Sequence, residues 1–395
     1  MKSILIINTL YSPYIGGGAE IICQELAEGL GNIGYHVAIL TTTDKEGVNE
    51  DIVGGLKVYR VHLENNYWHY NNKPPKIKRM FWHIHDIYNN GMKKHVQYVI
   101  CKENPDIIIC HNITGFSISI WDVIKKADLP IIQVLHDQYL QCPNSNAYKG
   151  NRQCERQCWS CKMMRIPHKK KSQQIDVVVG VSNYVLNRLL SLGYFKGCRH
   201  EVIHNARSFE DVPIKSLWNA KRPLRIGYIG TLSPVKGVEW LIQTFINLDI
   251  NATLKISGNA ISNEYGEYLR EIAKTDERIS FSGYVDSISH YRDIDLSVIP
   301  SLWPDTFPTV AFESCANNVP VIATKIGGLP EIIYNDVNGI VIEVDNKNAL
   351  KSAIMKIYNN PNLLEKLTLS ARDSVKEMCD KENMINKYCE IIESL

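Results

Sequence analysis

The chain has 395 residues, which is long enough for two domains that each bury a core of their own. Lysine plus arginine (44) nearly balance aspartate plus glutamate (42), and charged residues make up 22%, which argues against a disordered chain and against a nucleic-acid partner. No apolar run approaches the roughly 20 residues that cross a bilayer, and the first residues resemble a buried strand more than a secretory signal. We therefore predict a cytoplasmic protein.

The two halves of the chain differ in charge. Residues 1–205 hold 24 basic and 17 acidic residues, a balance of +7, whereas residues 206–395 hold 20 and 25, a balance of −5. The first half is therefore expected to face an anion or an anionic surface.

Short apolar runs alternate with amphipathic stretches along the whole chain. In the first half the runs predict strands at Ile4–Asn8, Val37–Leu40, Asp106–Cys110, Ile131–Leu135 and Ile175–Val181. In the second half they predict strands at Arg225–Ile229, Thr253–Ser257, Leu296–Ile299, Val321–Ala323 and Ile340–Ile342. Residues 64–80 read as a long loop, and the C-terminal region predicts helices at 349–358, 363–377 and 382–395.

Nearly continuous apolar strands between helices predict parallel sheets that are covered on both faces. The pattern occurs twice, so the fold class is α/β, with two doubly wound, Rossmann-like domains facing a cleft. The expected domains are 1–205, with a Cys-rich loop at 142–161, and 223–378, joined by a linker at 206–222. The last segment, 379–395, is expected to be a helix that packs back on the N-terminal domain.

Glycines follow the first strand of each half, and in the second half a lysine follows them. Gly16-Gly17-Gly18 precedes the first helix, where free N–H groups attract anions, although a tight turn alone would explain the glycines. In the second half, Gly230 and Thr231 open a loop in which Lys236 stands just before a helix. A lysine beside a helix N-terminus suits a diphosphate, whereas most isolated lysines are merely solvated.

Two carboxylates flank the start of a later helix. Asp305 lies in the loop before Pro308 and Glu313 on the first turns after it, and Gly327-Gly328 follows the next strand. Solvated acids are the common fate of such pairs, but the neighbouring side chains Phe307 and Phe312 are apolar.

With these motifs together, the chain resembles the retaining family 4 glycosyltransferases of the GT-B fold. The resemblance rests on the Gly230 to Gly237 loop, on Asp305 ahead of Glu313, and on the run Pro320–Thr324 followed by Gly327, Gly328 and Glu331. In the first half it rests on the early glycine loop, on His136-Asp137 after a strand, and on residues 202–205.

The resemblance implies roles for particular residues. Lys236 would bind the donor diphosphate and Glu313 the ribose, and Gly230, Thr231, Gly327, Gly328 and Glu331 would line the donor site in the 223–378 domain. Gly17 and Gly18 would approach the phosphates or the acceptor from the 1–205 domain, and His136 would reach the donor sugar. The implied catalytic residues are His136, Asp305 and Lys236.

Two positions depart from the family pattern. Asp305 stands where glutamate is usual, and Thr231 where arginine is common. In the implied mechanism the leaving phosphate takes the acceptor proton on the same face of the sugar, Lys236 and helix N-termini stabilise the diphosphate, and catalysis uses no metal or other cofactor.

Four cysteines fall within the loop at 142–161. Their spacing, x11, x3 and x2, is typical of structural zinc, with unliganded thiols an equal alternative and an iron–sulfur cluster a weaker one. The candidate ligands are Cys142, Cys154, Cys158 and Cys161.

Basic residues also gather at Lys76–Arg79 and Lys169–Lys171. The first cluster stands beside the apolar residues Met80, Phe81, Trp82, Ile84 and Ile87. It predicts either a peripheral membrane contact or a helix that packs into the core with a solvated basic end.

The expected function is transfer of a sugar from a UDP-, GDP- or ADP-sugar to a glycan or lipid-linked acceptor, in the synthesis of a surface polysaccharide or other glycoconjugate, at the inner face of the membrane. The alternatives are a nucleotide-sugar epimerase of the same fold and an inactive scaffold protein.

Overall fold

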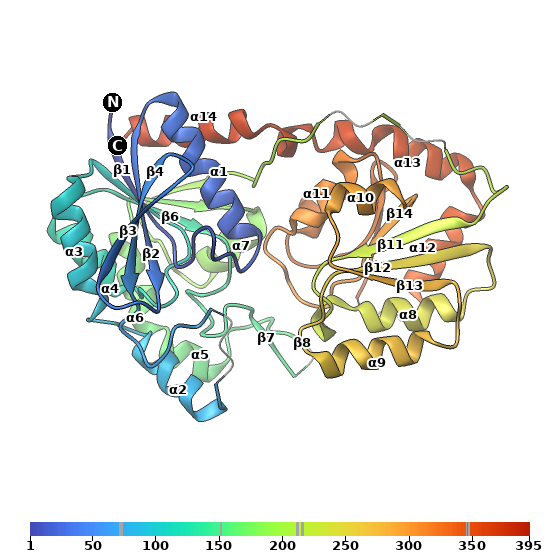
Figure 1. The fold of residues 1–395 in the computed structure, drawn as a ribbon, viewed down its shortest axis with the longest axis horizontal. Helices are drawn as coiled ribbons and strands as arrows, with labels where there is room; N and C mark the ends of the chain where they lie inside the picture. The colour runs from blue at the N-terminus through green and yellow to red at the C-terminus, as the bar shows by residue number, and fades with distance from the viewer. Residues whose placement is uncertain (71–73, 151, 211–212, 215–216, 345, 347) are drawn as a thin grey trace. The chain divides into compact units, whose positions relative to one another are not determined.

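The computed structural model describes residues 1–395 except 71–73, 151, 211–212, 215–216, 345 and 347. The chain forms two compact units (Figure 1). Unit 1 contains Met1–Ala147, Cys154–Arg207 and Asp380–Leu395, and unit 2 contains Tyr148–Gln153 and Ser208–Cys379. Each unit is built on a parallel sheet with helices, so the predicted α/β class with two doubly wound sheets is confirmed.

Unit 1 has an eight-stranded sheet in the order β10-β9-β6-β5-β1-β2-β4-β3, in which only β3 runs antiparallel to its neighbour. β1 lies centrally between β2 and β5, and Ile4–Ile7 are almost fully buried because helices cover both faces of the sheet. The strands are β1 (Ser3–Ile7), β2 (His36–Thr43), β3 (Val48–Val53), β4 (Leu56–His62), β5 (Ile107–Cys110), β6 (Ile131–Leu135), β9 (Val177–Gly180) and β10 (Arg199–Val202).

The helices of this unit include the C-terminal one. α14 packs on α1, where Ile385 fills the space beside Gly29, and Lys381 pairs with Glu25 at 2.7 Å. The helices are α1 (Gly18–Ile33), α2 (Lys76–His85), α3 (Met92–Glu103), α4 (Ser119–Lys126), α5 (Trp159–Met164), α6 (Ile166–Lys171), α7 (Asn183–Ser191) and α14 (Lys381–Glu393).

Unit 2 has a six-stranded parallel sheet in the order β13-β12-β11-β14-β15-β16. The strands are β11 (Leu224–Ile229), β12 (Ala252–Ser257), β13 (Ile279–Gly283), β14 (Leu296–Ile299), β15 (Val321–Thr324) and β16 (Gly339–Ile342). The helices are α8 (Val238–Ile246), α9 (Asn263–Ala273), α10 (Ser287–Arg292), α11 (Thr309–Ala316), α12 (Ala349–Tyr358) and α13 (Pro361–Ser374). The short hairpin β7 (Tyr148–Lys149) and β8 (Arg152–Gln153) also belongs to this unit.

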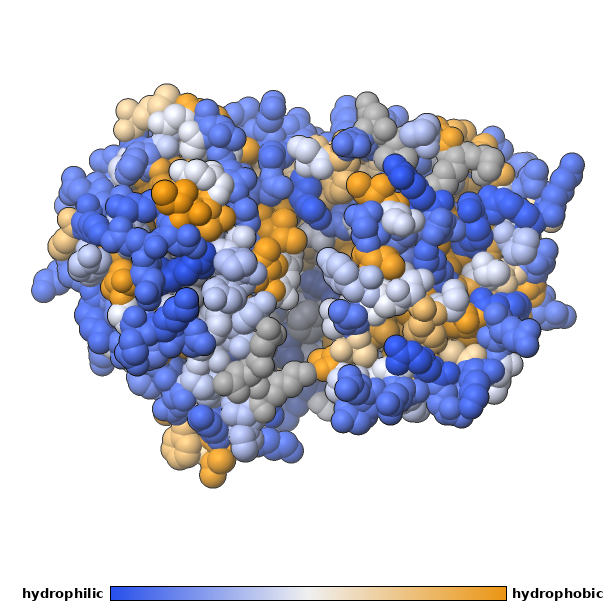
Figure 2. All heavy atoms as spheres, in the orientation of Figure 1, coloured by the Kyte–Doolittle hydropathy of each residue, from blue (hydrophilic) through white to orange (hydrophobic). Residues whose placement is uncertain are grey.

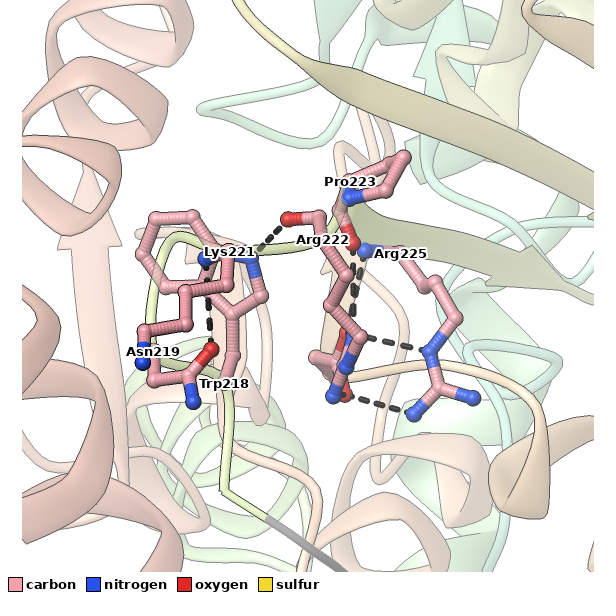
Figure 3. Close-up of polar contacts among 7 residues, drawn as sticks. Trp218, Asn219, Lys221, Arg222, Pro223 and Arg225 are labelled. Carbon is pink, nitrogen blue, oxygen red and sulfur yellow. Dashed lines mark hydrogen bonds and ion pairs between the residues drawn. The ribbon is translucent and has the colours of Figure 1, made fainter.

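A buried carboxylate fixes the chain where it enters the second sheet. Asp295 accepts hydrogen bonds from the Arg222 guanidinium at 2.6 and 2.8 Å and from the Arg225 side chain at 2.7 and 3.1 Å. Figure 3 shows the two arginines side by side. Burial would raise the pKa of Asp295, but the two guanidinium groups outweigh it and lower the pKa. Both arginines precede or begin β11, and Asp295 immediately precedes β14, so the contact ties the start of these paired strands together.

Some elements differ from the sequence-based predictions. The stretch 64–80 is not all loop, because α2 begins at Lys76; three residues of that prediction, 71–73, lie outside the described part of the chain. Strands β3, β4, β10 and β13 were not predicted, and three of them are edge strands of their sheets. Within the described residues, no helix is both long and apolar enough to cross a membrane.

Candidate functional site

Lys236 lies in unit 2 in the connection between β11 and α8. It ends a short 3-10 turn, Pro234–Lys236, and Gly237 then turns the chain in the left-handed conformation (φ +71°) into α8. The Lys236 Nζ lies 2.5 Å from the Asp305 Oδ2 and 5.3 Å from the centre of the Trp303 ring. Two of the three implied catalytic residues, Lys236 and Asp305, therefore form an ion pair.

Glycines let three loops of this unit pack backbone against backbone. A Cβ atom on Gly237 would stand 1.9 Å from the Pro300 carbonyl oxygen, and one on Gly327 would stand 2.1 Å from that of Asp305. The Gly328 N–H donates to the same Asp305 oxygen at 2.8 Å. These contacts hold together the loops that follow β11, β14 and β15, so Lys236, Asp305, Gly327 and Gly328 form one cluster.

The sheet topology explains why a ligand would bind there. β11 lies between β12 and β14, and the strand order continues from β12 to β13 on one side and from β14 to β16 on the other. In a parallel sheet the carboxyl ends of all strands share one edge, and ligands bind where the strand order reverses. The cluster around Lys236 lies at that edge, at the reversal between β11 and β14.

The other donor-site residues lie on the same connections. Glu313 is buried on α11, which follows the Asp305 loop, and Glu331 is half-buried at the end of the 3-10 turn after Gly328. Thr231 is exposed, and its carbonyl accepts the Tyr228 hydroxyl at 3.0 Å. Gly230 has a φ of +145°, and its carbonyl oxygen is so close to Gly258 that a Cβ there would lie 1.9 Å away.

In unit 1 the glycine loop carries a carboxylate rather than a cation. The Gly17 N–H donates to the Glu20 Oε2 at 2.8 Å, and Glu20 is buried at the start of α1. Burial raises the pKa of Glu20 above its ordinary value. A Cβ on Gly17 would meet only this carboxylate, at 3.9 Å, so packing within the chain does not require glycine there. The Gly17 N–H already donates to Glu20 and is not available to a ligand. The predicted close approach of a ligand is therefore supported by Gly18 and by the open space beside the Gly17 backbone.

His136 directly follows β6 and forms a pair with His111, which directly follows β5. His136 Nε2 and His111 Nδ1 are 2.8 Å apart, and the rings stack with their centres 5.0 Å apart. Burial lowers the pKa of His136 to about 4, and burial together with its neighbour lowers that of His111. At neutral pH both imidazoles are therefore neutral, and His136 is suited to hydrogen bonding with a sugar hydroxyl rather than to acting as a charged acid.

This pair predicts a pH dependence of stability. An unfolded histidine titrates near 6.5, so between about pH 6.5 and pH 4 the unfolded chain binds protons that the folded His136 does not. Stability should therefore decrease as the pH falls through that window. The melting temperature of the wild-type chain should fall more between pH 7 and pH 5 than that of His136→Gln. His85→Gln, at an exposed histidine of α2, should keep the wild-type slope; equal slopes for wild type and His136→Gln would contradict the prediction.

The four cysteines of the 142–161 loop come together in unit 1. Together with Gln157 and Arg188 they line one small cavity of about 10 Å³. A cavity of this volume holds one particle of about the size of a water molecule. The Cys161 thiol is in hydrogen-bonding contact with those of Cys142 and Cys158. Within the described residues, no three cysteine, histidine, aspartate or glutamate side chains are arranged to hold a metal ion as they stand.

The helix α2 does not pack its apolar residues into the core. Only Trp82 is buried, with its indole N–H donating to the Tyr67 carbonyl at 3.0 Å, whereas Ile77, Met80, Phe81 and Ile84 are 51–65% exposed. Apolar side chains gather at this end of unit 1 (Figure 2). The alternative of a core-facing helix is therefore wrong, because one large aromatic side chain anchors α2 and leaves the others in solvent.

Two residues of these sites, His111 and Trp303, were not identified from the sequence. His111 could have been found, because it follows its strand at the same position as His136 follows the next one, and β5 and β6 are neighbours. Trp303 had no sequence signal beyond its place in the Asp305 loop, since its ring contact with Lys236 depends on how two separate loops pack.

Comparison with known proteins gives two matching family models. Residues 16–210 match the model described as Glycosyltransferase Family 4, and residues 210–374 match Glycosyl transferases group 1. An uncharacterized 42.6 kDa protein in the cps region of Klebsiella pneumoniae is 27% identical over 331 residues, which is 84% of this chain and 87% of that protein.

Solved structures share the fold over the full chain. Sucrose-phosphate synthase from Thermosynechococcus elongatus aligns with a TM-score of 0.76 at 19% identity, covering 100% of this chain and 99% of that one. Anabaena HepE in complex with UDP aligns with a TM-score of 0.74 at 16% identity, covering 100% of both chains, and the same protein has been solved with UDP-glucose.

Proposed function

Because the chain belongs to the family 4 glycosyltransferases, we propose that it transfers a sugar from a nucleotide-diphosphate sugar to a glycan or lipid-linked acceptor, with retention of the anomeric configuration. The observation that carries the proposal is the cluster of Lys236, Asp305, Gly327 and Gly328 at the strand-order reversal of unit 2. It places a lysine ammonium, which suits a diphosphate group, on tightly packed loops at the edge of the sheet where ligands bind.

In the proposed reaction the bond between the sugar C1 and the diphosphate oxygen breaks, and a bond from C1 to the acceptor oxygen forms on the same face. The acceptor hydroxyl proton passes to the leaving diphosphate oxygen. Lys236 stabilises the charge that develops on the diphosphate, Glu313 holds the ribose, and His136 contacts the sugar as a neutral donor. Glu331 and the backbone at Gly230 and Thr231 complete the donor site. This scheme requires neither a catalytic metal nor another cofactor.

We propose a uridine nucleotide as the donor base. HepE, which has the same fold, binds UDP and UDP-glucose, so a uridine nucleotide is the first donor to test, ahead of GDP- and ADP-sugars. The cps-region relative supports polysaccharide synthesis as the setting.

The stereochemical outcome can be tested without knowing the acceptor, because water can replace it. Proton NMR of a fresh mixture of protein and the best-binding α-linked nucleotide sugar should show the α-anomer of the free sugar first, before mutarotation. The β-anomer first would contradict retention, and a new epimeric nucleotide sugar would favour the epimerase alternative.

An inactive scaffold should be indifferent to Asp305→Glu, whereas an enzyme should change its rate, since the carboxylate is paired with Lys236.

We place the protein at an anionic membrane face through α2. The helix exposes Ile77, Met80, Phe81 and Ile84 beside the basic residues Lys76, Lys78 and Arg79. Apolar residues next to lysines and arginines are typical of helices that lie in the headgroup region. Liposomes containing anionic lipid should sediment the wild-type chain and leave Met80→Ser/Phe81→Ser in solution; equal recovery of both proteins in the supernatant would refute the contact.

The cysteine cavity supports a structural zinc ion held by Cys142, Cys154, Cys158 and Cys161. The chain purified without chelator should contain close to one equivalent of zinc, and Cys158→Ser should lose it. Cys101→Ser, at an exposed thiol elsewhere in unit 1, should retain it. A folded wild-type preparation with less than about a tenth of an equivalent would rule the ion out.

A further inference from the structure

A cavity of about 800 Å³ lies in unit 1. It includes Lys169 and Lys170 of the predicted basic cluster, and it shares Gln157 and Arg188 with the cysteine cavity. The cavity is lined by residues 155–157, which precede α5, by residues of α6, and by the end of α7. Much of the lining, 169–173 and 191–196, lies where strands β9 and β10 begin. His111 and His136 stand at the opposite, carboxyl edge of the same sheet, so the cavity is a separate site.

The cavity is strongly cationic, and its exposed and half-buried cations lack carboxylate partners, while Arg188 donates hydrogen bonds to the Gln141 side chain and to the Cys154 and Glu155 carbonyls. Glu155 is the one acidic side chain among the residues that line it, and six exposed or half-buried cations surround it. None of these six makes an ion pair within the described part of the chain: Arg156, Lys162, Lys169, Lys170, Arg188 and Lys196.

Neighbouring lysines that face away from the cavity do have partners. Lys171, next to Lys170, pairs with Asp122 at 2.5 Å, and Lys125 pairs with Asp176 at 2.9 Å. Lys169, Lys170 and Lys196, which border the cavity, have no such carboxylate partner among the described residues. Like charges held together repel one another, and an anionic ligand would relieve that repulsion.

Arg165 borders the same cavity, but its guanidinium is turned into the protein. It also borders the cavity, yet it is only 1% exposed, and its guanidinium lies 4.4 Å from the centre of the Tyr139 ring. One nitrogen, Nη1, bonds to His168 Nε2 at 2.6 Å, but Nε and Nη2 have no hydrogen-bond partner. Asp86 and Asp137 act on Arg165 only through the electrostatic field. The guanidinium is therefore enclosed beside Tyr139, and the exposed cations rather than Arg165 are the groups that a ligand in the cavity would meet.

We propose that this cavity binds a ligand that carries a diphosphate group. The number of cations without a carboxylate partner exceeds what a single monoanion needs, and the volume is within the range that takes a small molecule beyond the diphosphate itself. Trp159, Met163 and Ile166 are 50–77% exposed on α5 and α6 next to the cavity, which suits a diphosphate attached to a lipid. The proposal does not depend on glycosyl transfer, because its residues are distinct from the donor cluster in unit 2.

The test is isothermal titration calorimetry of inorganic pyrophosphate into the full chain carrying Lys236→Ala, which removes the cation of the donor cluster. We expect about one equivalent to bind, with the affinity at least 10-fold weaker after adding Lys169→Glu/Lys196→Glu. The matched control, Lys45→Glu/Lys126→Glu, makes the same change in charge at exposed lysines of unit 1 outside the cavity and should stay within twofold. Both pairs replace exposed side chains, so folding should survive, and circular dichroism checks it.

A vesicle sedimentation experiment distinguishes a lipid diphosphate from a soluble one. Vesicles with and without a polyprenyl diphosphate are sedimented with the same three proteins. Capture that requires the polyprenyl diphosphate and is lost in Lys169→Glu/Lys196→Glu would assign a lipid ligand, and pyrophosphate binding alone would assign a soluble one. Equal loss in the charge-matched control, or no binding of either probe by the folded chain, would overturn the proposal.

Discussion

Replacing Lys236 with alanine is expected to remove donor binding and to lower kcat/KM by about 100- to 1,000-fold, the range seen when one group that stabilises developing charge is deleted. The ammonium is the one cation in the cluster formed by Asp305, Gly327 and Gly328. Its loss leaves the Asp305 carboxylate to repel the diphosphate. The measurement is the initial rate of nucleoside diphosphate release at several donor concentrations.

Lys255→Ala is the matched control for that variant. Lys255 also pairs with an aspartate, Asp293, at 2.6 Å, and its side chain is 24% exposed against 27% for Lys236, but it lies within β12 rather than at the strand ends. Its replacement should change stability slightly and kcat/KM by less than about threefold. If both variants lose activity to the same degree, the effect is general destabilisation and Lys236 is not the diphosphate ligand.

The second large effect is expected at Gly327. Its φ is +58°, and a Cβ atom would lie 2.1 Å from the Asp305 carbonyl oxygen, so Gly327→Ala combines backbone strain with a clash against backbone. We expect a loss of more than about 3 kcal/mol in the free energy of unfolding, and a displaced Asp305 loop that no longer holds Lys236. Urea unfolding and donor titration measure the two consequences.

Gly283 separates strain from the clash. It has nearly the same backbone angle, φ +64°, in the same unit, but a Cβ there meets nothing within 4 Å. Gly283→Ala should therefore lose only about 1 kcal/mol and should keep donor binding. Equal destabilisation by the two substitutions would show that the close packing of the Gly327 and Asp305 loops is not what holds the cluster together.

The sequence predicted the interior of the fold better than its edges. Central strands such as β1 and β5 are buried on both faces and therefore appear as continuous apolar runs. β3 and β13 are edge strands with exposed and half-buried residues, and β10 begins with the exposed residues Arg199 and His200, so none of the three gives such a run. α2 was hidden because prolines and asparagines precede it and only Trp82 contacts the interior.

The candidate site was predictable to a similar extent. Lys236, Asp305 and Gly327 follow three strands of one sheet, so a parallel topology is sufficient to bring their loops to a common edge. The Lys236–Asp305 ion pair and the Gly17–Glu20 contact depend on side-chain packing that no motif encodes. The basic cavity was out of reach for the same reason: its cations come from residues 156 to 196, and only the folded chain shows which of them lack a carboxylate partner.

We expect the cluster around Lys236 to bind a nucleotide-diphosphate sugar. The most direct test is thermal stabilisation of the folded chain by UDP, GDP, ADP and their sugar conjugates. At a ligand concentration of about 100 times Kd the stabilisation is about 2.7 kcal/mol, or roughly 5–10 °C in melting temperature for a unit of this size. We predict a shift of that order with one base, the uridine series first, that disappears in Lys236→Ala and Glu313→Ala. No shift with any of these ligands, in a preparation shown to be folded, would contradict the claim and leave the inactive scaffold as the better account.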